Sequence, residues 1–179
     1  MIDLTKHVLP EAVIVSGEAF RIHTDFTYWI NFSRLIQDKE LPLKAFDFLY
    51  VDEKPENRGD GFQELVNFFI NKRELPRNLD EGKPHEKQFD FFIDADLIYS
   101  AFYQQYKIDL TTAHLHWFKF QALLFGLKDT KFTDVLNYRG YDPNDKRDYK
   151  KFMQQMHDIW TIETTTDEEK AILEHYNSL

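Results

Sequence analysis

A chain of 179 residues is long enough for one domain with a hydrophobic core, and two domains would be unusual at this length. Its 22 basic and 31 acidic residues give a net charge of −9, which argues against nucleic-acid binding because that activity needs a concentrated basic face. The absence of cysteine excludes disulfide bonds, thiolate zinc sites and cysteine nucleophiles.

The first predicted element is a β-hairpin over residues 12–23. Two short β-prone runs, 12–15 and 19–22, flank Ser16-Gly17, and glycine supplies the positive φ angle that a tight turn requires. A lone hairpin is only marginally stable in water, so we expect this one to lie against helices.

Two amphipathic helices are predicted next, over residues 26–37 and 61–72, because apolar residues recur there at helical spacing. Thr24 or Asp25 is expected to cap the first of them. Between the two helices, residues 43–50 are expected to form either a short helix or one turn followed by a strand.

A long connection is predicted over residues 74–88. This segment contains two prolines and one glycine, which interrupt regular structure, and it is rich in charged residues. Such a stretch without apolar periodicity is typical of a surface loop.

Residues 89–127 contain the strongest helical signal in the chain. A first helix is predicted to begin near Ile93 or Asp94 and to be followed by a turn over residues 107–112. A second helix of about residues 113–125 is apolar nearly all round, which is typical of a buried helix. We therefore place this second helix at the centre of the core. The structural core is expected to include Trp29, Phe102, Leu115, His116, Trp117, Phe120 and Leu124.

Three further helices are predicted after this stretch. Thr130 or Asp129 is expected to cap a short one, and Asp142-Pro143 is a favourable start for a longer one that ends near Trp160. Residues 166–169 have the pattern of a capping box ahead of a short terminal helix.

Together these elements predict a mainly α fold, a helical bundle around the buried helix at about 113–125, with a small N-terminal β-hairpin over 12–23. The chain is expected to form a single domain over residues 1–179, with its helical core over residues 25–140. Within this domain, any semi-independent lobe is expected to consist of residues 142–179.

A histidine pair offers one interpretation as a metal-dependent enzyme. His114 and His116 lie in the same stretch of sequence as Asp94, Asp96 and Asp109. On a helix, however, side chains two residues apart point about 200° away from each other and cannot bind one ion together. We therefore favour a structural role in which His116 makes a buried hydrogen bond.

The sequence contains no other pattern that is typical of catalysis. Asp94-x-Asp96 is better explained by carboxylates at a helix start, where the helix dipole favours negative charge. Glycine-rich phosphate loops and serine nucleophile motifs are both absent from the sequence. We expect a protein without catalytic residues, bound metal or cofactor.

Two aromatic surfaces are candidates for partner binding. Tyr99, Tyr103 and Tyr106 have apolar rings with polar tips, although we favour a position at the border of the core with their hydroxyls in water. The second candidate is the helix that ends near Trp160. Its side chains Phe152, Met153, Met156 and Trp160 fall along one side. Methionine adapts to varied partners, and packing on the chain's own core is the alternative.

The stretch 89–127 also carries a family resemblance. Acidic residues precede a helix, and an isoleucine-aspartate-leucine turn and a leucine-histidine-tryptophan sequence follow. The residues concerned are Asp90, Asp94, Asp96, Ile98, Tyr99, Phe102, Tyr106, Ile108, Asp109, Leu110, Leu115, His116, Trp117, Phe120, Leu123, Leu124 and Leu127. This pattern resembles the phage family called gene product fifteen, in which a second tryptophan usually stands where this chain has Phe118.

Genes of that family lie in the tail modules of phages and prophages with long non-contractile tails, near the tape-measure gene. Their position is similar to that of tail assembly chaperones. The resemblance therefore implies a chaperone that binds the tape-measure protein, and other tail proteins, in the host bacterial cytoplasm. A structural tail subunit, such as a terminator or connector ring, is the alternative. The sequence has no apolar run of membrane-spanning length.

Overall fold

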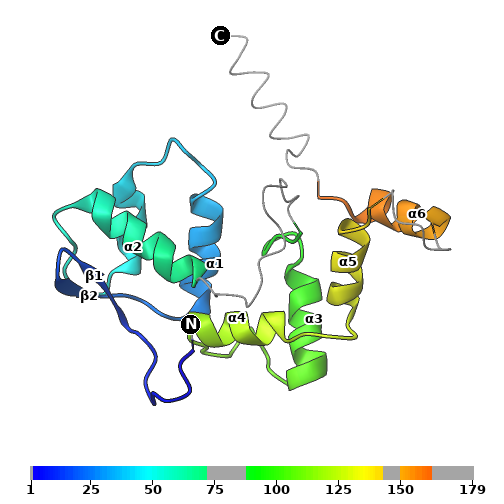
Figure 1. Cartoon of the computed structure of the whole chain (residues 1–179), viewed down its shortest axis with the longest axis horizontal. Helices are drawn as coiled ribbons and strands as arrows, with labels where there is room; N and C mark the ends of the chain where they lie inside the picture. The colour runs from blue at the N-terminus through cyan, green and yellow to red at the C-terminus, as the bar shows by residue number, and fades with distance from the viewer. Residues whose placement is uncertain (1, 72–87, 143–149, 163–179) are drawn as a thin grey trace, which may run out of the picture. The chain divides into compact units, whose positions relative to one another are not determined.

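The structure is a computed structural model that describes residues 2–71, 88–142 and 150–162. The described part is mainly α-helical with one two-stranded antiparallel sheet near the N-terminus, which confirms the predicted fold class (Figure 1). In chain order the elements are β1 (Ala12–Val15), β2 (Glu18–Arg21), α1 (Phe26–Leu35), the 3-10 helix η1 (Leu43–Leu49), α2 (Arg58–Ile70), α3 (Ala95–Tyr106), α4 (Trp117–Phe125), α5 (Lys131–Arg139) and α6 (Lys150–Trp160).

The chain divides into two compact units. The first consists of Met1–Glu81 and Tyr99–Leu127, and the second consists of Gly82–Ile98 and Lys128–Leu179. The division falls inside α3. Each unit is therefore assembled from segments that are far apart in the sequence.

Three sequence predictions concern segments outside the described residues. They are the connection over residues 74–88, of which only Gln88 is described, the helix start at Pro143, and the capping box and terminal helix after residue 166. Among the described residues, no helix is both long enough and apolar enough to cross a membrane.

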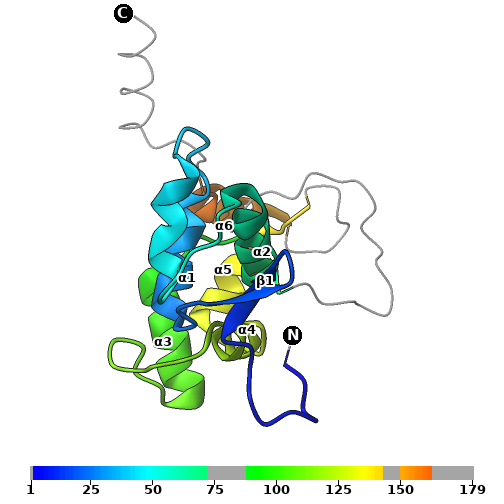
Figure 2. The same ribbon diagram turned by 90° about the vertical axis from the view of Figure 1, so that its left-hand side faces the viewer.

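The predicted hairpin is present in the first unit. Ser16 and Gly17 both have positive φ angles, of 52° and 88°, as in the two-residue turns whose twist matches that of the flanking strands. Val13 and Val15 are buried, and β1 lies beside α2 (Figure 2). On the side away from β1, the end of β2 pairs with a third segment, because the N–H of Val51 donates to the carbonyl of Arg21 over 3.0 Å.

Local capping determines where α1 and α2 begin. The Asp25 side chain accepts a hydrogen bond from the N–H of Thr27, which confirms one of the two predicted caps of α1. The second helix begins at Arg58, three residues before the predicted start, because the Asn57 side chain accepts from the N–H groups of Gly59 and Asp60. The helix ends at Ile70, and the next residue, Asn71, has the left-handed backbone conformation that is typical of a helix C-terminus.

The start predicted for the central helix at about residue 113 is wrong, since α4 begins at Trp117. The preceding residues are extended and pair with the segment before α1. The N–H of Phe26 donates to the carbonyl of Leu115 over 2.9 Å, and the N–H of Trp117 donates to the carbonyl of Thr24 over 2.7 Å. These bonds satisfy backbone groups that the predicted helix would have paired internally. Leu115 and His116 therefore lie half-buried ahead of the helix.

The buried side of α4 is the centre of the first unit. Trp117, Phe120 and Leu124 are at most 5% exposed, and Trp29 and Phe102 are fully buried around them. The rings of Phe102 and Phe120 stack with centroids 5.2 Å apart, and those of Trp29 and Trp117 lie 6.4 Å apart. Such aromatic pairs stabilise a core beyond the area they bury.

Buried polar groups in this core are satisfied by specific partners. The indole N–H of Trp117 and the amide of Gln121 both donate to the carbonyl of Phe69, over 2.9 and 3.0 Å. Asn71 in turn donates to the Gln121 side chain over 2.9 Å. These bonds hold the C-terminal end of α2 against α4, where unpaired groups would be costly.

The beginning of α2 packs closely on the loop that precedes it. Gly61, Pro55 and Tyr50 are all buried. The Tyr50 hydroxyl has no hydrogen-bond partner in the part of the chain that the structure describes. Its burial raises the pKa of Tyr50 to about 12, although the nearby Arg58 opposes this rise. The absence of a side chain at Gly61 is what lets the tyrosine and the proline approach the helix.

Replacing Gly61 with alanine is expected to lower the free energy of unfolding by about 1–3 kcal/mol. The new Cβ would lie 2.5 Å from Cγ of Pro55 and 2.8 Å from the Tyr50 hydroxyl. The control is Gly59→Ala in the same helix turn, where the nearest atom lies at 3.4 Å and helix propensity favours alanine. Urea denaturation followed by circular dichroism measures both. Equal effects of the two substitutions would contradict close packing at Gly61.

Candidate functional site

The four side chains predicted to bind a partner lie on α6 in the second unit, where α6 packs on α5. Phe152 approaches Tyr138 of α5 edge-on with ring centroids 6.2 Å apart, yet 52% of Phe152 is exposed. Met153, Met156 and Trp160 are half-buried, and no residue of α6 is buried. One side of α6 is therefore only partly covered by α5.

An open groove runs along α5 beside this surface. It is lined by Leu136, Tyr138 and Tyr141, together with Met153 of α6. The ammonium group of Lys131 lies 5.2 Å from the ring centroid of Trp160, within range of a cation–π interaction. Gln88, Asp134 and Asn137 add polar groups to the same lining. The structure thus places a groove of mixed lining, with a flexible methionine, next to the exposed ring of Phe152. We call this combined surface of α5 and α6 the α5–α6 surface.

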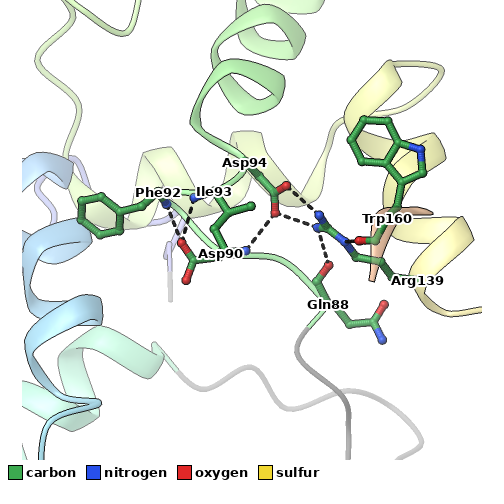
Figure 3. A network of polar contacts seen from close by, with 7 residues as sticks. All are labelled: Gln88, Asp90, Phe92, Ile93, Asp94, Arg139 and Trp160. Atoms are coloured by element: carbon green, nitrogen blue, oxygen red, sulfur yellow. Dashed lines mark hydrogen bonds and ion pairs between the residues drawn. The ribbon is translucent and has the colours of Figure 1, made fainter. Parts of the chain in front are cut away.

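A buried ion pair holds the second unit together at one end of this surface (Figure 3). Arg139 at the end of α5 donates two hydrogen bonds to the two carboxylate oxygens of Asp94, over 2.7 and 2.8 Å. The Arg139 and Asp94 side chains are only 5% and 1% exposed. Planar guanidinium and carboxylate groups match in this bidentate arrangement, which fixes direction as well as distance.

The same guanidinium also binds two backbone carbonyls. Its Nε donates to the carbonyl of Trp160 over 2.7 Å, and one terminal nitrogen donates to that of Gln88 over 3.2 Å. Arg139 therefore joins α5, the last residue of α6 and the segment that leads into α3. Arg139 thereby helps to orient the α5–α6 surface, together with the hydrogen bond between Nδ1 of His157 in α6 and the carbonyl of Tyr138 in α5, over 3.1 Å.

Asp94 and Asp96 both lie at the start of α3, as the sequence predicts, but the Asp94 carboxylate also has a buried partner that the sequence does not reveal. Asp94 lies immediately before α3 and is buried against Arg139, whereas the exposed Asp96 occupies the first helical turn. Asp94 also accepts from the N–H of Asp90 over 2.9 Å. The Asp90 side chain accepts from the N–H groups of Phe92 and Ile93, so the two aspartates together form the turn.

Sequence reasoning missed Arg139, although a signal was present. Arg139 follows Phe132 and Val135 at helical spacing, and both of those residues are buried. A charged residue that continues an apolar helix face needs a buried partner of opposite charge. The sequence does not show which carboxylate supplies it, because Asp94 lies 45 residues away.

The geometric argument against a His114–His116 metal pair is wrong, because these residues are extended and not helical. In an extended segment, side chains two residues apart point to the same side. Both nitrogens of His116 are nevertheless in use. Its Nδ1 accepts from the N–H of Phe118 over 3.0 Å, so its Nε2 carries the proton and donates to the carbonyl of Pro10 over 2.9 Å. His116 is thus the N-cap of α4.

The other candidate ligands do not gather around this histidine. The exposed His114 has its Nδ1 3.4 Å from a carboxylate oxygen of Asp25. Within residues 2–71, 88–142 and 150–162, no three histidine, aspartate or glutamate side chains are placed to hold one metal ion.

The three tyrosines of α3 have different environments. The rings of Tyr99 and Tyr103 stack with centroids 6.3 Å apart, and 53% of Tyr103 is exposed. The Tyr106 hydroxyl donates to the carbonyl of Leu123 in α4 over 2.9 Å. Tyr106 therefore has a structural contact inside the first unit, and Tyr103 presents its ring to solvent.

Comparison with known proteins identifies the family. A family model described as Bacteriophage Gp15 protein matches residues 5–162, which is most of the chain. The chain therefore belongs to the bacteriophage Gp15 protein family. No curated protein and no solved structure matches it.

Replacing Arg139 with methionine is expected to lower the free energy of unfolding by about 3–5 kcal/mol, because it leaves the Asp94 carboxylate buried without its partner. The double variant Arg139→Met with Asp94→Leu removes both charges and should recover much of that loss. Arg34→Met, at an exposed position of α1, is the control. If urea denaturation showed no recovery in the double variant, the loss would not come from an unpaired buried charge.

His116 should make stability depend on pH. Burial lowers the pKa of His116 below its usual value, so the folded state favours the neutral ring that caps α4. As the pH falls from about 7 towards about 5, the unfolded state takes up the proton first and the free energy of unfolding falls. Above about pH 7 the His116 ring is neutral in both states, so it no longer makes the free energy of unfolding depend on pH. The variant His116→Asn keeps a capping side chain that does not titrate. Its stability, measured by urea denaturation, should fall less steeply over the same range, and identical slopes would contradict the prediction.

Proposed function

We propose that this member of the bacteriophage Gp15 family is a tail assembly chaperone that binds the tape-measure protein and catalyses no reaction. The observation that carries the proposal is the α5–α6 surface, where a helix with apolar side chains along one side has no buried residue of its own. An amphipathic helix that is half covered is suited to receive an apolar segment of a partner.

The physical task of such a chaperone is to cover apolar surface for a limited time. A tape-measure chain exposes apolar helical stretches before the tail tube encloses it, and exposed apolar patches favour self-association. The α5–α6 surface offers the ring of Phe152 and the thioethers of Met153 and Met156, which adapt their shape to different side chains. The net charge of −9 adds attraction towards basic segments of the client.

In the proposed binding mode, Arg139 helps to hold α6 in the position that binds the partner. Because no residue of α6 is buried, this helix depends on its contacts with α5 to stay in place. The hydrogen bond from Arg139 to the carbonyl of Trp160 attaches the end of α6 to α5. The helix can thereby present its apolar side chains in a fixed direction while those side chains stay accessible.

Co-expression with the tape-measure protein of the same gene cluster tests the proposal. We expect the client to stay soluble and to co-purify only when this chain is present, because its apolar segments are then covered. Met156→Asp combined with Trp160→Ala should abolish both effects, since a charge on the surface opposes apolar contact. The client's soluble fraction and the amount that co-purifies are the measured quantities.

Gln155→Asp provides the matched control, because it introduces the same charge at an exposed position of α6. It should leave the client soluble. A client whose solubility is indifferent to this chain would contradict the chaperone proposal. If the purified protein instead forms closed rings, a structural tail subunit becomes the better assignment.

A further inference from the structure

Among the described residues, the first unit has a strand edge without a neighbouring strand, and the proposed function does not use this edge. In the hairpin, Val15 pairs with Glu18, Val13 with Phe20, and Glu11 receives a hydrogen bond from the N–H of Ile22. These are the hydrogen-bonded pairs, so the intervening Ala19 directs its N–H and carbonyl away from β1. Ala19 is exposed. Its two backbone groups therefore face the outer edge of β2.

Another segment of the same chain pairs with the C-terminal end of this edge only. Residues 49–51 run antiparallel to residues 21–23, with the N–H of His23 donating to Leu49 over 2.8 Å and that of Val51 donating to Arg21 over 3.0 Å. Beyond Val51, the chain turns away from β2. The edge next to Ala19 is thus a continuation of an existing ladder, with the strand missing.

A groove lies between the hairpin and residues 52–57, the segment that follows this ladder. Val15, Phe20 and Pro55 contribute its apolar lining. Its carboxylates are Glu18, Asp52, Glu53 and Glu56. Asp52 is paired with Arg21, and the Lys54 of the groove is paired with Asp47. In the described part of the chain, the three glutamates form no ion pair, so the groove has an excess of negative charge.

We propose that the outer edge of β2 and this groove bind an extended, basic peptide segment of a partner protein as an added β-strand. Backbone bonds to Ala19 supply the register. Because Glu18 and Phe20 share one face of β2, lysine or arginine at alternate positions of the added strand can place its aliphatic stem on the apolar lining and its charge beside the glutamates. A second copy of this chain is a poor occupant, because pairing two identical edges would bring the same carboxylates together. The site lies in the first unit, and it does not depend on the function proposed for α6.

The test uses the full-length protein and a labelled peptide of alternating lysine and valine, seven residues long, with binding measured by fluorescence anisotropy. We expect saturable one-to-one binding that weakens as salt rises. A peptide of alternating glutamate and valine should not bind. A version of the basic peptide with methylated backbone nitrogens should also fail to bind, because it cannot donate to the strand edge. Equal binding of the methylated peptide would overturn the proposal.

Two pairs of variants place the site on the protein. Ala19→Pro removes the outward N–H of β2 and should weaken binding by about tenfold. Ala12→Pro makes the same change on the opposite edge of the hairpin and should have no effect, since Ala12 also sits in a pair without hydrogen bonds. Glu53→Lys should weaken binding by about fivefold, and the exposed Glu40→Lys should not.

Each remaining result of the peptide titrations supports or overturns the strand-addition site. Circular dichroism establishes that each variant is folded before it is titrated. If neither proline weakens binding, the peptide is attracted only by net charge and the strand-addition site is wrong. Equal weakening by both prolines would also contradict a site at the outer edge of β2. If the protein instead dimerises in a manner that Ala19→Pro abolishes, the edge serves a second copy and the proposed partner is wrong.

Discussion

The first unit depends on a short antiparallel contact between two segments that are far apart in the chain. Residues 24–26 and 115–117 exchange backbone hydrogen bonds of 2.7 and 2.9 Å, and α1 and α4 both begin at this point. Because the two helices start side by side, Trp29 and Trp117 are brought into the same core. Aromatic rings from α2 and α3 then complete it. Loss of this contact would separate the two helices that bring Trp29 and Trp117 into the core.

The second unit depends on a different kind of constraint. A buried ion pair contributes little net stability compared with apolar residues of similar volume, because both charges lose their hydration. Its value here is geometric. Arg139 binds a carboxylate and two carbonyls from separate segments, and each of them accepts only along particular directions. Among the described residues of this unit, only Ile98, Phe132 and Val135 are buried apolar side chains, and Arg139 adds a polar contact that fixes how the segments meet.

The features that sequence analysis predicted correctly are those decided within a few residues. The Ser16-Gly17 turn, the Asp25 cap of α1 and the Thr130 cap of α5 all depend on neighbours along the chain. The errors have a different origin. The helix start at Trp117 and the role of Arg139 depend on partners that are distant in sequence, and helical periodicity carries no information about them. Partner binding by the four side chains of α6 stays a prediction, although the structure places all four beside α5.

The distribution of tryptophan has a practical consequence. Of the three in the chain, Trp29 and Trp117 lie close together in the core of the first unit, and Trp160 ends α6 in the second. Indole emission shifts to shorter wavelength as water is excluded, so the buried pair and the half-buried third ring should emit differently. The protein thus contains its own optical reporters. With Trp160 as the ring open to the solvent at α6, intrinsic fluorescence can follow events on that helix without an attached dye.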